Sequence, residues 1–171
     1  VVPQLQSLNL GDPLHSTKPF RARASSSNTN TSTTSAASSL PEVWIVKHFF
    51  PRHLVIQARV TNQAALSEKA GRTLTDICFV VAESSEEAIQ PLLQVPIAVL
   101  PTGMTGCTWC VLSAAPTRME GSTAQKTCEL RYTVSAQGDV MAALNPQQQG
   151  AMMGRTFVEE LQDLEVHASH F

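Results

Sequence analysis

The chain has 171 residues, with 12 Lys and Arg against 14 Asp and Glu and a formal net charge of −2. No dense Lys/Arg cluster is present, which argues against a nucleic-acid-binding protein. No apolar run reaches the about 18 residues that a membrane-spanning helix needs. The chain begins with Val and not with Met, so we expect a fragment of a longer protein.

Residues 1–40 are predicted to form a flexible, largely disordered linker. The first stretch, "VVPQLQSLNLGDPLHSTKPFRAR", is broken by Pro and Gly, and residues 24–39 read "ASSSNTNTSTTSAASS". This second stretch has no large apolar side chain and no charge, so it cannot bury enough surface to offset the entropy of ordering it. The globular part is therefore expected at 41–171, a length that suits one core.

From Pro41 onward the apolar residues follow a period of two, which is typical of strands. Val43, Ile45 and either His48 or Phe49 alternate with a second set that we expect to face outward: Trp44, Val46 and Lys47. Further strand patterns follow in chain order: "HLVIQARVTN" (53–62), "TLTDICFVVAE" (73–83), "LLQVPIAVLP" (92–101), "CTWCVLSAA" (107–115) and "TCELRYTVSA" (127–136).

Helix candidates are few. "SSEEAIQPLLQ" (84–94) is interrupted by Pro91, and residues 157–164 show helical spacing that also fits a final strand, so this segment stays open. Residues 138–154 are predicted to be a low-complexity loop insertion. Six or seven strands without βα alternation predict an all-β fold, an immunoglobulin-like antiparallel β-sandwich preceded by the disordered linker.

The sharpest local motif is "CTWC" at Cys107–Cys110, which is half of a zinc site or a redox pair elsewhere. In a strand its two sulfurs point to opposite faces, which prevents joint ligation. We therefore expect four ordinary reduced cysteines. Without a nucleophile elbow, a phosphate loop or a partnered histidine, we expect no enzyme, no catalytic residue, no metal and no cofactor.

An alternative is a secreted or cell-surface immunoglobulin-like binding domain, with Cys78–Cys128 or Cys107–Cys110 oxidised. The position of Trp109, far beyond Cys78, does not fit the spacing of such domains. A count of free thiols distinguishes the two possibilities.

Several segments together resemble the appendage (ear) domain of the gamma subunit of coatomer, the COPI vesicle coat. They are, in one order, "VKHFFPRHLVIQARVTN", "TLTDICFVVAES", "QVPIAVLPTGMTGCTWCVL", "CELRYTVSAQGDV" and "FVEELQDLEVHASH". The specificity lies in their number and order. Upstream, "LGDPLHSTKP" is similar to an element of that family's hinge.

The resemblance implies a non-enzymatic module of the coat, hung from its core by a hinge and recruiting accessory proteins in Golgi-to-ER transport. It implies other coatomer subunits and an Arf GTPase-activating protein as partners, peripheral membrane association through the coat, and no nucleic acid. The implied location is the cytoplasm, on the cytosolic face of Golgi membranes and COPI-coated vesicles. The family's second, platform subdomain, which carries its known partner pocket, is expected to lie beyond residue 171.

If the sandwich itself binds a partner, exposed cations on its first strands are the candidates. Charge and expected facing select Lys47, Arg52 and Arg59 as partner-binding residues.

Overall fold

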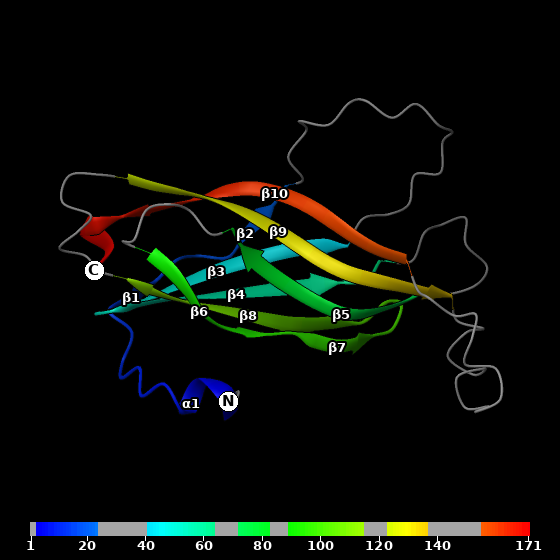
Figure 1. Ribbon diagram of the computed structural model, residues 1–171, viewed down its shortest axis with the longest axis horizontal. Coiled ribbons are helices and arrows are strands. Elements are labelled where there is room, and N and C mark those ends of the chain that lie inside the picture. Colours follow the sequence, from blue (N-terminus) through cyan, green and yellow to red (C-terminus); the bar gives the residue numbers. More distant parts are fainter. Residues whose placement is uncertain (1–2, 24–40, 64–71, 83–88, 115–122, 137–154) are drawn as a thin grey trace.

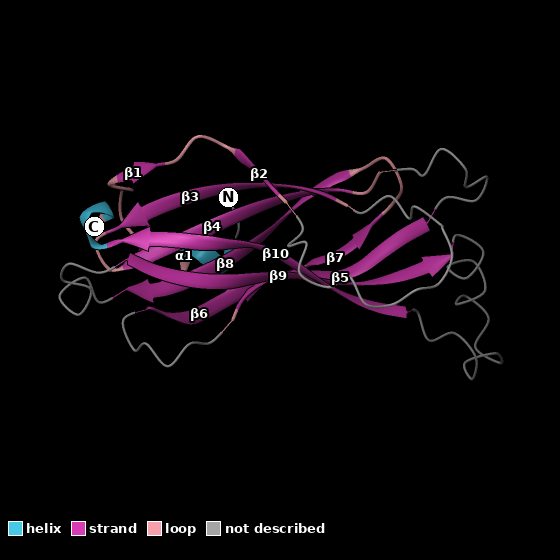
Figure 2. Cartoon of the chain, turned by 90° about the horizontal axis from the view of Figure 1, so that it is seen from above, coloured by secondary structure: helices cyan, strands magenta, loops and turns pink. Residues whose placement is uncertain are grey.

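The structure, a computed structural model, describes residues 3–23, 41–63, 72–82, 89–114, 123–136 and 155–171. In this part of the chain two antiparallel sheets face each other and enclose one main apolar core (Figures 1 and 2). The predicted all-β, immunoglobulin-like sandwich is confirmed.

The first sheet has the strand order β1-β3-β4-β8-β6, and β2 also pairs with β3. Its strands are β1 (His15–Ser16), β2 (Phe20–Ala22), β3 (Glu42–Phe50), β4 (His53–Thr61), β6 (Ile89–Val95) and β8 (Thr105–Ala114). The second sheet has the order β10-β9-β5-β7, with β5 (Arg72–Val81), β7 (Ile97–Leu100), β9 (Thr123–Ala136) and β10 (Arg155–His167). A short helix α1 (Pro3–Gln6) and a 3-10 turn η2 (Ala168–His170) lie near the two ends.

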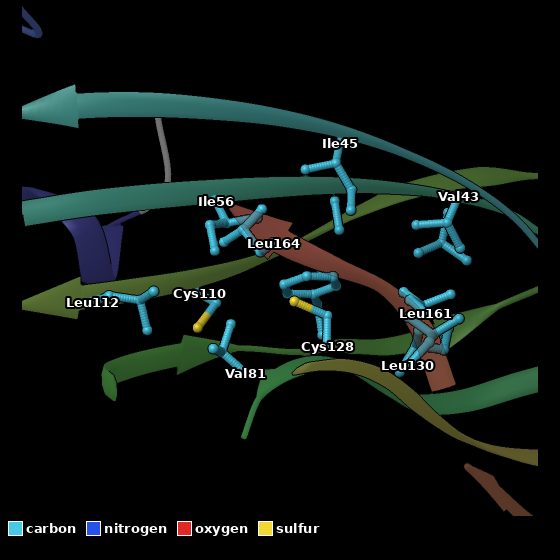
Figure 3. Close-up of a cluster of buried hydrophobic side chains, with 14 of the residues drawn as sticks. Val43, Ile45, Ile56, Val81, Cys110, Leu112, Cys128, Leu130, Leu161 and Leu164 are labelled. Atoms are coloured by element: carbon cyan, nitrogen blue, oxygen red, sulfur yellow. The ribbon is translucent and has the colours of Figure 1, made fainter. Parts of the chain in front are cut away.

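The core is built from the alternate residues of these strands, as the period-two pattern predicts. In β4 the inner face is formed by Leu54, Ile56, Ala58 and Val60, all fully buried. Figure 3 shows side chains of both sheets meeting between them, with Ile45 and Ile56 on one side and Leu130 and Leu161 on the other. Burial of each such side chain contributes about 1.5–3 kcal/mol.

β6 and β7 are one stretch of chain that changes sheets at Pro96. Residues up to Val95 pair with β8, and Ile97 pairs with Ile77 of β5. Proline has no amide hydrogen to donate to a ladder, so the change of partner falls where a ladder bond is already missing. The helix candidate at 84–94 is wrong over 89–94, which form β6, and residues 84–88 lie outside the described residues.

The open question at 157–164 is answered by β10, which is a strand throughout. Leu161 and Leu164 are both buried although they lie three residues apart. The register of β10 against β9 shifts between these two residues. This irregularity turns both side chains inward, and it produced the helix-like spacing in the sequence.

The N-terminal residues are more ordered than a linker. Residues 3–23 contain α1, β1 and β2, and both strands pair with β3. Residues 24–40 and the loop insertion predicted at 138–154 lie outside the described residues. The division into a linker at 1–40 and a sandwich at 41–171 therefore stays a prediction. Within 1–40, β1 and β2 form part of the first sheet of the sandwich.

The facing of β3 differs from expectation at Lys47. Of the two residues left open, Phe49, and not His48, continues the buried face of Ile45. Lys47 lies between these two in the alternation and therefore shares the inner face, so its expected outward orientation is wrong.

Candidate functional site

Lys47 connects the two sheets. Its Nζ donates a hydrogen bond to the Glu165 carbonyl oxygen at 2.9 Å and lies 5.7 Å from the centre of the Phe20 ring. Partial burial lowers the pKa of Lys47, and the charge of Glu165 opposes that shift. An ammonium held in this way is poorly placed to meet a partner.

Arg52 and Arg59 are both exposed, but they lie at different places. Arg52 is in the turn between β3 and β4, whereas Arg59 is on the outer face of β4, beside Trp44 of β3. Six strand residues separate Arg59 from the start of β4, a distance of about 20 Å along the strand. The structure therefore does not bring the three candidate residues together, and a partner-binding role for any of them stays a prediction.

The outer face of the first sheet carries a groove that the sequence did not single out. Its volume is about 270 Å³, and it is lined by Pro19, Trp44, Val46, Gln57 and Arg59. Trp44 is 38% exposed. The signal was present in the run "VWIV", where both faces of the strand are apolar, whereas the solvent face of an antiparallel strand is usually polar.

The same outer face is covered nearer the other end of the strands by the N-terminal segment. Leu5, Leu8 and Leu10 pack against a small cluster formed by Phe50, Val55 and Val111, with Leu93 and Trp109 at its side. Figure 1 shows α1 below β6 and β8, on the opposite side of the molecule from β9 and β10. We refer to these eight residues as the leucine-covered patch.

A larger cleft, of about 480 Å³, opens between the edges of the two sheets. Cations and carboxylates of both sheets line it together with apolar side chains: Arg21, Ala22, Arg23, Pro41, Glu42, Val43, Leu130, Glu159 and Leu161. Three of its charged groups already have partners, because Arg21 pairs with Glu42 and the Tyr132 hydroxyl donates to Glu159. This mixture of charges selects no class of ligand.

The cysteines follow the predicted geometry. Cys107 faces outward and accepts a hydrogen bond from Gln57, whereas Cys110 is fully buried in the core. Burial raises the pKa of Cys110 to about 12, and it raises the pKa of buried Cys128 to about 12 as well. Thiols of this kind are chemically inert, and the two sulfurs of the "CTWC" motif cannot bind one ion together.

Histidines and aromatic rings gather where the C-terminus meets β1 and β3. The rings of His15 and Phe49 stack at 4.4 Å, and His170 lies 5.6 Å from His15 and 5.1 Å from His167. Burial, His167, Lys47 and His15 lower the pKa of His170. No group of three or more His, Cys, Asp or Glu in the described part of the chain has the arrangement to hold a metal ion.

None of the helices in the described ranges is both long enough and apolar enough to cross a membrane.

Comparison with known proteins matches this chain to a family. The family model described as "Coatomer gamma subunit appendage platform subdomain" matches residues 23–150, three-quarters of the chain. Its description names the platform subdomain, whereas the sequence led us to expect the platform beyond residue 171, so the assignment of this chain within the appendage stays a prediction. A search of curated proteins finds no match.

Proposed function

Because the chain belongs to the family of the coatomer gamma subunit appendage, we propose that it recruits accessory proteins to the COPI coat during transport from the Golgi to the endoplasmic reticulum. An appendage is a structural module of the coat and is not known as an enzyme. The proposed part is the recruitment of accessory proteins and the role in transport between the Golgi and the endoplasmic reticulum.

The family match over 23–150 carries this proposal. The fold supports it, because a rigid antiparallel sandwich presents broad outer sheet faces on which a partner can dock. The outer face of the first sheet contributes the exposed groove beside Trp44 and Arg59. This groove is a structural reason to expect protein binding.

The proposed partners are the other coatomer subunits, through the rest of the gamma subunit, and an Arf GTPase-activating protein. The proposed location is the cytosolic face of Golgi membranes and of COPI-coated vesicles, reached through the coat.

The test is replacement in cells. The endogenous gamma subunit is depleted and replaced either by the intact subunit or by one from which residues 3–171 of this chain are deleted. We expect the deleted form to enter the coat but to retain less of the GTPase-activating protein at the Golgi and to slow the return of an escaped endoplasmic-reticulum protein.

Two measurements make this test decisive. Co-sedimentation of the deleted subunit with the other coat subunits shows that the coat still assembles. Unchanged recruitment and unchanged return transport in an assembled coat would refute the proposed function.

A further inference from the structure

The outer face of the first sheet is more apolar than the solvent-facing side of a sheet usually is. Trp44, Val46 and Trp109 lie on it, next to the buried residues of the leucine-covered patch. In an antiparallel sandwich the outer face is ordinarily polar. An apolar strip on this face is therefore available for contact with another polypeptide.

Next to this strip, the same outer face already binds a segment of the same chain. The leucines of residues 3–10 rest on Phe50, Val55 and Val111, although α1 has only four residues and none of them is buried. The contact thus depends on single leucine side chains that a short segment presents, and not on a packed helix. It shows that this face accepts apolar side chains from a short segment.

The groove continues this contact. Gln57, in its lining, lies directly opposite Trp109 of the leucine-covered patch in the β4–β8 ladder. The volume of about 270 Å³ lies just below the about 300–1,000 Å³ of small-molecule pockets. A groove of this size suits one or two side chains of an extended segment.

The charged side chain that lines the groove within the described ranges is a cation. The Arg59 guanidinium lines it and has no ion pair or hydrogen bond with any residue of the described ranges. Lys18 precedes the lining residue Pro19 and is exposed, and Arg21 lies opposite Trp44 in the β2–β3 ladder. None of the described carboxylates lines the groove, and Glu42, which lies beside it, is paired with Arg21.

We propose that this groove, which we call the Trp44–Arg59 groove, binds a short acidic segment of a partner protein that inserts one large apolar side chain between Trp44 and Val46 and places a carboxylate on Arg59. The Trp44 ring supplies contact area, and the Arg59 guanidinium supplies a bidentate donor for a carboxylate. This inference rests on the proposed function, since it names the surface by which an appendage takes up an accessory protein.

The probe is a synthetic peptide of about ten residues in which one Phe is flanked on both sides by Asp in a Gly–Ser background. It contains no Trp, so the two tryptophans of the chain, Trp44 and Trp109, report on binding by fluorescence and by their indole N–H signals in NMR. A peptide with Ala for Phe and a peptide with Lys for Asp serve as ligand controls.

We expect saturable binding that shifts the Trp44 indole signal and weakens as salt screens the charges. Arg59→Glu and Trp44→Ser should each weaken binding by about fivefold or more, because each removes one half of the recognition. Arg131→Glu changes an exposed arginine of the second sheet, outside the groove, and should alter the affinity by less than about twofold. Unfolding midpoints of the three variants show that the sandwich is intact.

The inference is overturned if the peptide does not bind, if Arg131→Glu weakens binding as much as Arg59→Glu, or if the Ala peptide binds equally well. Self-association of the chain that Trp44→Ser abolishes would also overturn it and would identify a second copy as the occupant. If the peptide does not bind but deletion of residues 3–171 impairs recruitment in cells, only the proposed groove is rejected. If the peptide binds but the deletion changes neither recruitment nor return transport, only the proposed function is rejected.

Discussion

At the scale of single residues, Asn62 illustrates how a polar side chain can hold a sandwich together. It is fully buried directly after β4, and its Nδ2 donates to the carbonyl oxygens of Arg72 and Leu100, both at 2.9 Å. Those carbonyls belong to β5 and β7 of the opposite sheet. One amide group therefore connects the two sheets where the core ends.

Asn62→Ala is expected to lower the free energy of unfolding by about 1–3 kcal/mol, because it removes two hydrogen bonds between the sheets. The Arg72 carbonyl keeps the Thr102 hydroxyl as a donor, whereas the Leu100 carbonyl loses its side-chain donor. Urea unfolding followed by circular dichroism measures the change. Thr127→Ala, at an exposed position of β9, is the control and should change stability by less than about 0.5 kcal/mol. Equal effects of the two substitutions would show that Asn62 is not a cross-link.

The four cysteines are expected to differ in their reactivity with thiol reagents. Cys110 and Cys128 are fully buried, and burial raises the pKa of each to about 12, so neither forms a thiolate near neutral pH. In the folded protein a thiol reagent should react with Cys107 and, more slowly, with Cys78, because burial also raises the pKa of Cys78. Cys110 and Cys128 should react only after unfolding.

A chromogenic disulfide reagent counts the thiols, and mass spectrometry after alkylation locates them. Reaction of all four cysteines in denaturant agrees with a reduced protein. Recovery of only two, with Cys78–Cys128 or Cys107–Cys110 oxidised, would favour the secreted immunoglobulin-like domain instead.

At the scale of elements, the N-terminal segment stabilises the sandwich from outside. Leu8→Asp places a carboxylate over Phe50, Val55 and Val111, so we expect stability to fall by about 1–2 kcal/mol and the binding of a hydrophobic dye to rise. Leu14, which is 51% exposed, supplies the control Leu14→Asp, with an expected change near zero. An equal loss in both variants would mean that the segment is not docked on this face in solution.

The strands with period two could be predicted from the sequence, because burial of one face alone dictates their alternation. β4 is the clearest case. β10 could not be decided, since the irregularity between Leu161 and Leu164 gives a strand the spacing of a helix. The N-terminal strands were missed because their order comes from pairing with β3, a long-range contact that leaves no local pattern.

The candidate site was predictable only in part, for the same reason. Arg59 is exposed on β4 as its alternation indicates, but Lys47 falls on the inner face, where its hydrogen bond to Glu165 depends on a strand far along the chain. The groove itself needs Pro19 and Trp44 side by side. That proximity follows from β2 pairing with β3.

At the scale of the whole molecule, the histidines join the first strand to the end of the chain and make this junction sensitive to pH. His170 meets His15 of β1, Phe49 of β3 and His167 of β10, and Lys47 and Glu165 are the other charged groups beside this junction. The pKa of His170 lies below its ordinary value of 6.5 because burial, His167, Lys47 and His15 disfavour the charged ring.

The unfolded chain therefore takes up this proton at a higher pH than the folded chain, and the stability contributed by neutral His170 is lost as the pH falls through about 6.5. Thermal unfolding midpoints should decrease from about pH 7.5 to about pH 5.5. His170→Gln should reduce this dependence, whereas His53→Gln, outside the junction, should leave it unchanged. A pH dependence that His170→Gln does not alter would contradict the prediction.

The pairing of β1 and β2 with β3 has a consequence for aggregation. These short strands occupy the side of β3 that does not face β4, and they hydrogen-bond at His48, Phe49 and residues 43–45. The linker-like composition of the first 40 residues suggests trimming the protein to begin at Pro41. The trimmed protein would expose that side of β3 as an open edge nine residues long. Open edges recruit strands of other molecules. A preparation that retains residues 15–22 should stay monomeric at concentrations at which the trimmed one forms intermolecular β-structure.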